Sequence, residues 1–537
     1  MVGLSKRYQY ILVAGAVCCF LNVVYLASKN GMLEGMGPKN PAFRHAVEEA
    51  EDTPIPTHVA SSTARAFAVQ MPMLQNDTLM QGRVAGAMSW AWGAYRKHAF
   101  GYDSLNVRDM APDGLPGHDM AISLVDSLDT LFIMNLMDEF NEAADWAEAN
   151  MLERHAQPPK VSIFETTIRN LGGLLSSYSL SGREGLLALA DDLGSRIHSG
   201  LRNTPLPLSL VSLLDGSTSD SSYVAEFTTI QLEFKYLAQL TGKVDYATAV
   251  DELMDKVADI VQRDFPDGVL PVIVDSWNGR IHPGTLKLGA GGDSYYEYLL
   301  KQWLFSGKTE TKYKDMYETA VHGIMTKLAG RTRKSNWLFL GELETSGFLS
   351  PKMDHLVCFI PGMLALGYVN GMPASHLAFA EELLHTCFQM YNQMGSKMAP
   401  EIAYFGVDKH DEMDIIVHPQ DAFNILRPET VESLMLLYRV TKNETYRAWG
   451  KVIFDAYESQ ARVAGGGYAS VGNVHQAQAT QFFRPTMDSF FMAETLKYFY
   501  LLFSDDHVVP LHSFVFNTEA HPFPIQHDGF QYHNDAL

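Results

Sequence analysis

Glu165 and Arg169, an acid and a base one helical turn apart, are the first candidates for catalytic residues. In the stretch 163–176 the apolar positions fill one wide helical face, and Glu165, Arg169 and Ser176 fall on a narrow stripe opposite. Gly172 and Gly173 flank that stripe, which indicates that another part of the molecule approaches closely. The alternative is an ordinary exposed ion pair at positions i and i+4.

A second candidate carboxylate is Glu429, in the stretch 427–433 (RPETVES). Pro428 suits the first position of a helix, which places Glu429 in the first turn, beside the positive end of the helix dipole. That field lowers the pKa of the carboxyl and keeps it ionised, as a general base requires. Glu432 follows on the same face. Acidic residues are also common structural choices in a first turn, so this alternative stays open.

A third candidate is Asp293, which follows the glycine-rich stretch 289–292. Ser294 and Glu297 fit a capping box, with the serine as N-cap, and Asp293 then lies just outside the helix. In the alternative, Asp293 is itself the N-cap. A phosphate-binding loop is excluded, because no Gly-Lys-Ser/Thr follows and a carboxylate would repel phosphate.

These carboxylates stand on three separate helical segments and combine acids with glycine or proline geometry. No arrangement of a nucleophilic serine or cysteine accompanies them. Paired carboxylates without such a nucleophile indicate acid/base hydrolysis of a glycosidic bond.

The elements that must position these acids are paired helices. From residue 85 to 502 the pattern is predominantly helical, and apolar helical runs end in similar turns at Gly182, Gly242, Gly307 and Lys442. A further pair fits the longest gap, with its turn at residues 370–371. A period of 60–70 residues suits repeated helical hairpins, which stack as a solenoid or close into a ring. The polar stripes favour a ring.

Length and composition restrict the class of protein. With 537 residues, 47% hydrophobic and 19% charged, the chain is typical of a globular protein. The net charge of −21 argues against a nucleic-acid partner, because a phosphate backbone requires a basic surface.

The N-terminal residues predict a membrane anchor. Residues 1–7 form a short cytoplasmic tail with two basic residues, and the apolar run 8–28 is long enough to cross a bilayer as a signal anchor. A cleaved signal peptide is the alternative. Residues 29–80, with five prolines and an acidic patch, are predicted to form a stem, and residues 81–537 the lumenal catalytic domain.

A lumenal location would make two further features usable. Asn76 and Asn443 begin glycosylation sequons. Outside the apolar run the chain has Cys358 and Cys387, for which one disulfide and two buried thiols are both compatible with the sequence.

Seven motifs, in order along the chain, resemble those of class I α-1,2-mannosidases, glycoside hydrolase family 47. They lie at residues 123–131 (SLVDSLDTL), 164–169 (FETTIR), 292–298 (GDSYYEY), 353–359 (MDHLVCF), 399–401 (APE), 427–433 (RPETVES) and 516–522 (FNTEAHP). The resemblance extends over about residues 85–524.

The resemblance implies an all-α fold, an (α/α)7 barrel of helical hairpins with small β elements and a C-terminal hairpin that plugs one end. It further implies an inverting, calcium-dependent hydrolase. Glu165 matches the family's proposed general acid and Glu429 its proposed base. Asp293 matches a third essential carboxylate, an alternative acid that acts through water. An inverting enzyme separates acid and base by roughly 6.5–9.5 Å, so that water fits between them.

The resemblance also assigns the remaining site residues. Thr518 matches the residue that binds Ca²⁺ directly, and water-mediated contacts to the ion are implied for Glu401, Glu432, Glu494 and Glu519. Substrate-binding positions are matched by Asp126, Arg169, His355, Arg427, Glu432, Phe490 and Glu494. Cys358 and Cys387 match the family disulfide.

One departure from the family pattern bears on specificity. Endoplasmic-reticulum members that remove a single mannose carry Arg two residues before the aspartate, where this chain has Gly291. The difference resembles Golgi and fungal members, which implies removal of several mannoses, high-mannose N-glycans as substrates and a Golgi membrane location. The endoplasmic reticulum is the alternative location, and the catalytic domain is expected to be monomeric.

Two other functions remain open at this point. One is a mannose-binding quality-control lectin of the same superfamily, which delivers misfolded glycoproteins to degradation. The other is a helical-repeat scaffold that binds protein partners along a concave face.

Overall fold

The helical spacing of apolar residues produces consecutive helical hairpins in a computed structural model of the chain. The structure describes residues 77–113, 119–157, 160–478, 480–481 and 484–530. All of them belong to the second of two compact units, which spans residues 69–537. The predicted tail and anchor, and Asn76, lie outside the described residues. No helix of the described residues combines the length and apolar content needed to cross a membrane.

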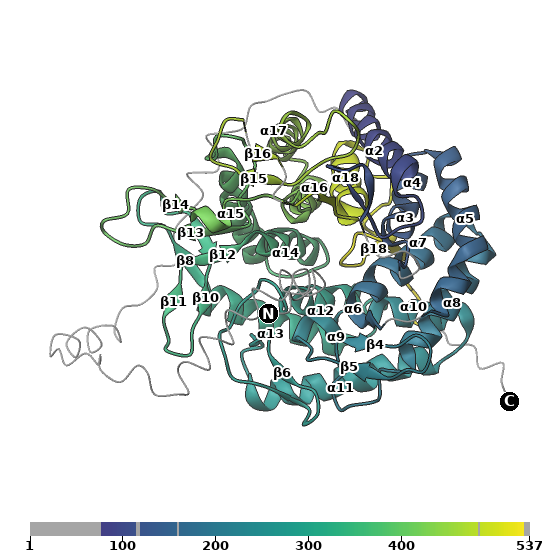
Figure 1. Ribbon diagram of the computed structural model, residues 1–537. Helices are drawn as coiled ribbons and strands as arrows, with labels where there is room; N and C mark the ends of the chain where they lie inside the picture. Colours follow the sequence, from purple (N-terminus) through teal and green to yellow (C-terminus); the bar gives the residue numbers. More distant parts are fainter. Residues whose placement is uncertain (1–76, 114–118, 158–159, 479, 482–483, 531–537) are drawn as a thin grey trace, which may run out of the picture. The chain divides into compact units, whose positions relative to one another are not determined.

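The first helices of the hairpins lie side by side around the centre of the unit (Figure 1). They are α4 (Leu128–Ile133), α7 (Gly172–Ser181), α10 (Gln231–Thr241), α12 (Asp293–Phe305), α14 (Ile360–Val369), α16 (Glu429–Thr441) and α18 (Leu496–Phe503). Each packs on the next in this order, and η6 (Phe491–Thr495), which leads into α18, packs on α4. The described helices therefore close into a ring, and the closed alternative to a solenoid is confirmed.

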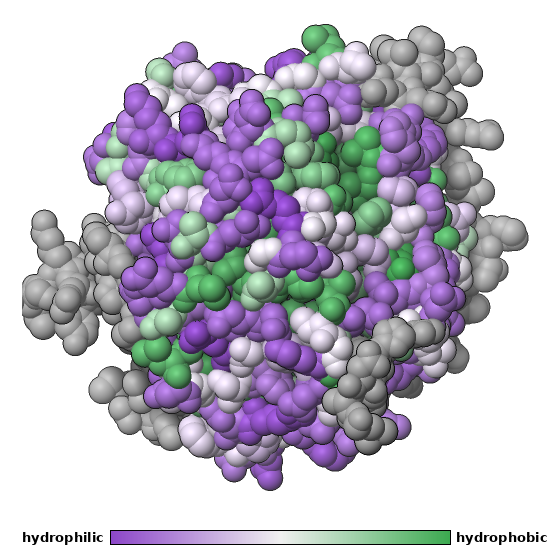
Figure 2. All heavy atoms as spheres, turned by 90° about the vertical axis from the view of Figure 1, so that its right-hand side faces the viewer, coloured by the Kyte–Doolittle hydropathy of each residue, from purple (hydrophilic) through white to green (hydrophobic). Residues whose placement is uncertain are grey.

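The second helices pack on the first and form an outer layer. They are α5 (Met137–His155), α8 (Glu184–His198), α11 (Asp245–Asp264), α13 (Thr311–Lys327), α15 (Ala374–Asn392) and α17 (Thr445–Gln460), and α2 (Thr78–His98) packs on α18 in the same way. An outer helix such as α11 buries one face, whereas α12 and α14 are buried on nearly all sides. On the side of the ring where α5 and α8 lie, hydrophilic residues cover most of the surface (Figure 2).

Short helical segments and short strands join the helices. The short helical segments are α3 (Ile122–Asp126), α6 (Ile163–Glu165), α9 (Val224–Thr228), η3 (Thr166–Leu171), η4 (His355–Phe359) and η5 (Pro419–Asp421). The sheets of three strands are β17-β1-β2 (Thr486–Met487, Ser104–Asn106, Ala111–Asp113), β3-β4-β5 (Val161–Ser162, Leu210–Val211, Thr218–Ser219) and β12-β13-β14 (Lys352–Asp354, Ile402–Phe405, Ile415–Ile416).

The other strands form antiparallel pairs. They are β6-β7 (Val274–Asp275, Arg280–Ile281), β8-β9 (Ala329–Arg331, Leu338–Leu340), β10-β11 (Glu342–Leu343, Leu349–Ser350), β15-β16 (Val471–Asn473, Thr480–Gln481) and β18-β19 (Phe514–Phe516, Pro522–Pro524). The last pair is the C-terminal hairpin, and it contacts α7 and α12 of the ring.

The predicted turns between paired helices are confirmed. Gly182, Gly242 and Lys442 end their helices in the left-handed conformation, with φ of 71°, 72° and 57°. Gly307 follows α12 with φ 62°, and the turn predicted near residue 370 follows α14.

Three local predictions differ from the structure. Helix α2 begins at Thr78, so it starts within the predicted stem, and the Asp77 side chain accepts a hydrogen bond from the Met80 amide at its start. Pro428 is the N-cap of α16 instead of its first helical residue. The capping box at Ser294 is wrong, because α12 already begins at Asp293 and its N-cap is Gly292.

The two glycines beside the Glu165 stripe are needed for close packing. A Cβ on Gly172 would lie 2.7 Å from Asn517 Nδ2, and a Cβ on Gly173 would lie 2.7 Å from the Val125 carbonyl oxygen. The prediction that another segment approaches these glycines is therefore confirmed.

We expect Gly173→Ala to lower the free energy of unfolding by about 1–3 kcal/mol, because the new methyl would overlap the backbone of α3. Gly93→Ala is the matched control, since Gly93 is an exposed glycine within α2 and a Cβ placed there would have nothing within 4 Å. That control should gain about 0.5–1 kcal/mol from helix propensity. Denaturant titration of both variants checks the prediction, and equal effects would contradict it.

Candidate active site

The tip of the C-terminal hairpin, residues 517–521, is a polar segment inside the ring. Asn517 and His521 are fully buried. Two buried lysines of the ring donate to its backbone: Lys301 Nζ lies 3.2 Å from the Asn517 carbonyl oxygen, and Lys497 Nζ lies 2.8 Å from that of Ala520. Because a buried carbonyl needs a donor, these bonds fix the tip at a defined depth.

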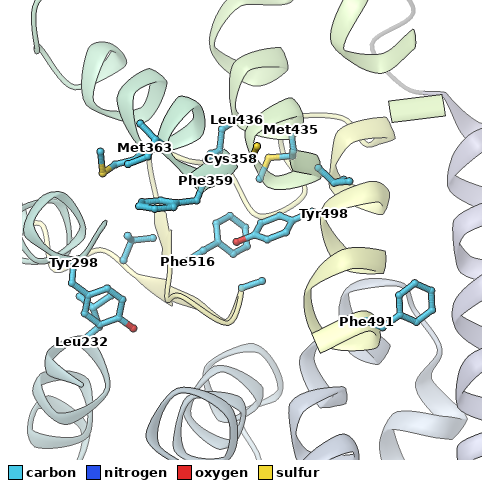
Figure 3. Close-up of a cluster of buried hydrophobic side chains, with 14 of the residues drawn as sticks. Leu232, Tyr298, Cys358, Phe359, Met363, Met435, Leu436, Phe491, Tyr498 and Phe516 are labelled. Carbon is cyan, nitrogen blue, oxygen red and sulfur yellow. The ribbon is translucent and has the colours of Figure 1, made fainter. Parts of the chain in front are cut away.

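Aromatic side chains from the ring pack against the same hairpin. Phe516, the last residue of β18, packs on Tyr498 of α18 with ring centroids 5.9 Å apart (Figure 3). Tyr298 of α12 lies on the other side, and its hydroxyl is 3.3 Å from the Thr518 amide nitrogen, which donates to it. Aromatic packing and backbone hydrogen bonds therefore hold the tip together.

Arg169 connects the first group of predicted residues. It lies in η3, a π-helical segment between α6 and α7, and π-helical turns are frequent at functional sites. Its guanidinium contacts predicted carboxylates and neighbouring groups: Glu165 at 2.7 Å, Asp126 at 3.6 Å, Ser489 at 3.1 Å, Glu519, and the ring of Phe490 at 5.9 Å. The structure therefore brings four other predicted site residues, Glu165, Asp126, Glu519 and Phe490, around the partly buried Arg169.

Glu429 and His355 form the centre of the second group. His355 Nδ1 lies 2.8 Å from Glu429 Oε2, and its other nitrogen lies 2.7 Å from the Tyr391 hydroxyl. Arg427 lies 4.0 Å from the other Glu429 oxygen and pairs with Glu401 at 2.5 Å. Burial raises the pKa of Glu429, but the hydrogen bond and charge of His355 and the charge of Arg427 outweigh it and leave this pKa lowered. Glu429 is therefore held ionised.

Asp293 has the opposite electrostatic environment. Burial, together with the negative charges of Glu297 and Glu429, raises its pKa to about 7, although it accepts a hydrogen bond from the Ser294 amide. The two candidate carboxyls thus differ in protonation at neutral pH. Such a difference between neighbouring acids is typical of acid/base pairs.

A third group of acids surrounds Thr518. The Thr518 hydroxyl donates to Glu297 at 2.7 Å, and Glu297 pairs with Lys301, which lies 3.9 Å from Glu432. Glu297 therefore serves this cluster instead of a capping box, which explains why that prediction failed.

The acids near Thr518 resist ionisation. Burial raises the pKa of Glu432 to about 8, with Lys301 opposing and Glu297 adding to the effect. Burial and the charges of Glu519 and Glu429 raise the pKa of Glu494 well above its usual range. Burial also raises the pKa of Glu519, despite its contact with Arg169.

These residues fit a hard cation held mainly through water. The donors are all oxygens, and a positive charge would relieve the repulsion between the acids. Among the described residues, no three His, Cys, Asp or Glu side chains form a set of direct metal ligands. The predicted arrangement does not need one, because only Thr518 is expected to bind directly. Glu401 contacts Arg427, and its assigned role near the ion stays a prediction.

Two predicted features lie outside these groups. Cys358 of η4 and Cys387 of α15 form a disulfide, which confirms the pairing that the resemblance implied. Asn443 is exposed in the turn between α16 and α17, where an attached glycan would meet no core residue.

Several site residues escaped the sequence analysis, namely Glu297 in its observed role, Lys301, Ser489, Tyr391 and Lys497. For Lys301, the sequence does contain a pattern from which a role in the site could have been predicted. Glu297 and Lys301 stand one turn apart in a helix whose other positions are nearly all apolar or aromatic, and charges in such a helix must face one another or a polar interior.

The chain is similar to known proteins over the region that contains these site residues. The family model of glycosyl hydrolase family 47 matches residues 87–525. The rat protein named endoplasmic reticulum mannosyl-oligosaccharide 1,2-alpha-mannosidase is 44% identical over 83% of this chain and 68% of its own length. The mouse protein of that name is 41% identical over 90% and 74%. The solved structure of an alpha-1,2-mannosidase from Trichoderma reesei superposes with a TM-score of 0.76 at 28% identity, over 84% of this chain and 99% of that one.

The raised pKa of Asp293 predicts a pH-dependent cost to folding. The carboxyl binds a proton up to about pH 7 when folded and up to about pH 4 when unfolded, so its contribution to stability is lost as the pH rises from about 4 to about 7. In the presence of a chelator, Asp293→Asn should therefore gain stability relative to the wild type over this window. The gain should be on the order of 2 kcal/mol, which is less than the full pKa shift would give, because the Asp293 side chain is partly exposed to solvent.

Denaturant titration at several pH values measures the difference. Asp259→Asn, at an exposed position in α11, is the matched control for the chemical change itself. A constant difference between Asp293→Asn and wild type from pH 4 to 8 would refute the assignment.

Proposed function

Because the chain belongs to glycosyl hydrolase family 47, we propose that it is a mannosyl-oligosaccharide 1,2-α-mannosidase of N-glycan processing. Its substrates would be high-mannose N-glycans on glycoproteins. One observation carries the proposal: an ionised Glu429, fixed by His355 and Arg427, stands near Asp293, whose pKa is raised to about 7. This pairing meets the needs of acid/base hydrolysis of a glycosidic bond.

The proposed reaction is an inverting hydrolysis. Glu429 accepts a proton from a water molecule, whose oxygen forms the new bond to the anomeric carbon. The glycosidic carbon–oxygen bond breaks, and a carboxylic acid, Glu165 or Asp293, gives its proton to the leaving oxygen. Glu165 is partly exposed and held by Arg169. Burial raises the pKa of Asp293 to about 7, so this carboxyl keeps its proton to a higher pH than an ordinary aspartic acid does. That supports its role as an alternative donor.

The ring and the hairpin tip support two finer parts of the proposal. The ring of paired helices would be an (α/α)7 barrel plugged at one end by the C-terminal hairpin. Ca²⁺ at Thr518 would supply a positive charge among Glu432, Glu494 and Glu519, whose pKa values burial raises. That charge would keep these acids ionised and the hairpin tip in place.

We further propose that several mannoses are removed per glycan, in the Golgi, by a monomeric lumenal domain on an N-terminal anchor. Gly291 supports the broad specificity. Its φ is +87°, and a Cβ there would lie 3.3 Å from Tyr223, so this backbone conformation favours glycine over any residue with a side chain. The endoplasmic reticulum remains the alternative location, and the rat and mouse relatives carry it in their names.

The first test incubates the 537-residue chain, in detergent, with a nine-mannose glycan. We expect release of several mannoses and loss of release when a chelator is added. Glu429→Gln should lower turnover roughly 10²-fold or more, the usual effect of removing an acid/base group. Mass spectrometry of the glycan measures the products.

The outcomes separate the candidate functions. No release by a folded, calcium-loaded chain that still binds mannose would favour the quality-control lectin. No release and no mannose binding would favour a protein-binding scaffold. Wild-type turnover by Glu429→Gln would refute the assignment of the base.

Gly291→Arg tests the specificity proposal. The arginine would begin against the Tyr223 side chain, two residues before Asp293, so we expect fewer mannoses to be released per glycan. Gly291→Ala is the matched control, because it introduces the same backbone strain without the guanidinium. A wild type that stops after one mannose, or an arginine variant with the product pattern of the alanine variant, would contradict the proposal.

A further inference from the structure

The sheet β12-β13-β14 has one buried and one partly exposed face. Its register pairs Lys352 with Tyr404 and Tyr404 with Ile416. Because side chains alternate along a strand, Met353, Ala403, Phe405 and Ile415 point the other way, and they are all buried. Lys352, Ile402, Tyr404 and Ile416 therefore share the accessible face.

That face combines an aromatic pair with charged groups. The rings of Tyr404 and His418 lie 4.2 Å apart at 34°, and the His418 side chain is 45% exposed. Lys352 Nζ bridges Glu342 at 2.7 Å and Asp354 at 2.8 Å. Apolar ring faces next to fixed charged acceptors suit a pyranose, which presents C–H groups on one side and hydroxyl groups at its edge.

The face is continuous with the candidate active site. Asp354 ends β12, and His355, the next residue, is the partner of Glu429. Asp354 also reaches the loop before Asp293, since a Cβ on Gly289 would meet its carboxylate. Glu401, the residue before β13, pairs with Arg427. Lys352, which lies opposite Tyr404, stands two positions before Asp354 in the strand, a step of about 7 Å. Tyr404 therefore lies near the Asp354 carboxylate on the accessible face.

We propose that the accessible face of β12-β13-β14, with Tyr404 and His418 at its centre, binds sugar residues of the glycan beyond the mannose that is cleaved, and so selects the branch. This inference rests on the proposed function. A polypeptide partner fits less well, because Lys352 and Asp354 lie across from Tyr404 and Ile402 in the register and charged groups therefore border the apolar side chains. The carboxylates of Asp421, Glu342 and Asp354 and the ammonium group of Lys352 lie around Tyr404, so hydrogen-bond acceptors and a donor are available to sugar hydroxyl groups.

The experiment compares a large and a small substrate with the full 537-residue chain. We would measure kcat/KM for the free nine-mannose glycan and for α-1,2-linked mannobiose with Tyr404→Ala, His418→Ala and Tyr404→Phe. Tyr404→Ala and His418→Ala should each lower kcat/KM for the glycan by about 10-fold, on the scale of one lost aromatic contact, and change the order of products. The value for the disaccharide should stay within about 2-fold, and Tyr404→Phe should retain the ring and the activity.

Tyr368→Ala is the matched control, because this exposed tyrosine lies at the C-terminal end of α14, away from His355 at the other end. It should leave both substrates unaffected. A wild type that cleaves neither substrate would refute the proposed function itself. A wild type that cleaves both, with variants that lose both equally or lose neither, would overturn only this inference. With a glycoprotein that carries the same glycan assayed alongside, a loss confined to that glycoprotein would overturn the inference in favour of polypeptide docking.

Discussion

A polar hairpin tip is buried in the centre of a ring of helices, and its need for hydrogen-bond partners constrains the helices around it. Burying backbone carbonyls, an asparagine and an imidazole is costly unless each finds a partner. The ring supplies those partners from several helices: Lys301 and Lys497 donate to carbonyl groups, and Asp126 and Asp129 contact the two nitrogens of His521. Because these partners come from different hairpins, the C-terminal segment links helices that are far apart in sequence.

The same burial sets the chemistry of the acids. Cations compensate some carboxylates directly, as Arg169 does for Glu165 and Arg427 for Glu401. Others, such as Glu494, are buried near further acids, and their pKa values rise. A ring interior with more acids than cations therefore resists full ionisation near neutral pH. This imbalance is the physical reason that the residues fit a divalent cation, and it is independent of any family resemblance.

Sequence patterns predicted the helical pairs and their turns, because the spacing of apolar residues along a helix and the glycine that ends it can both be recognised within a short stretch of sequence. They also identified Gly172 and Gly173 as sites of close approach. They could not predict that the Arg169 and Glu494 segments are π-helical, since the inserted residue is stabilised by tertiary contacts. The capping box at Ser294 failed for a related reason: Glu297 gains more from Lys301 and Thr518 than from a backbone amide. The assignments to mannose and calcium came from resemblance alone.

The candidate carboxylates share a position within their helices that is not obvious from their spacing in the sequence. Asp293 and Glu429 are the first residues of α12 and α16, and Glu165 lies in the short helix α6 that precedes η3. Helices that begin at the same end of the ring direct their positive dipole ends and free amide groups toward one region. Anions gain stability there, and the backbone amide already lowers the pKa of Glu429. The repeated hairpin therefore does more than enclose a space. It brings Asp293, whose pKa burial raises, and Glu429, whose pKa His355 and Arg427 lower, to helix starts in one region, so that one carboxyl keeps its proton where the other has lost it.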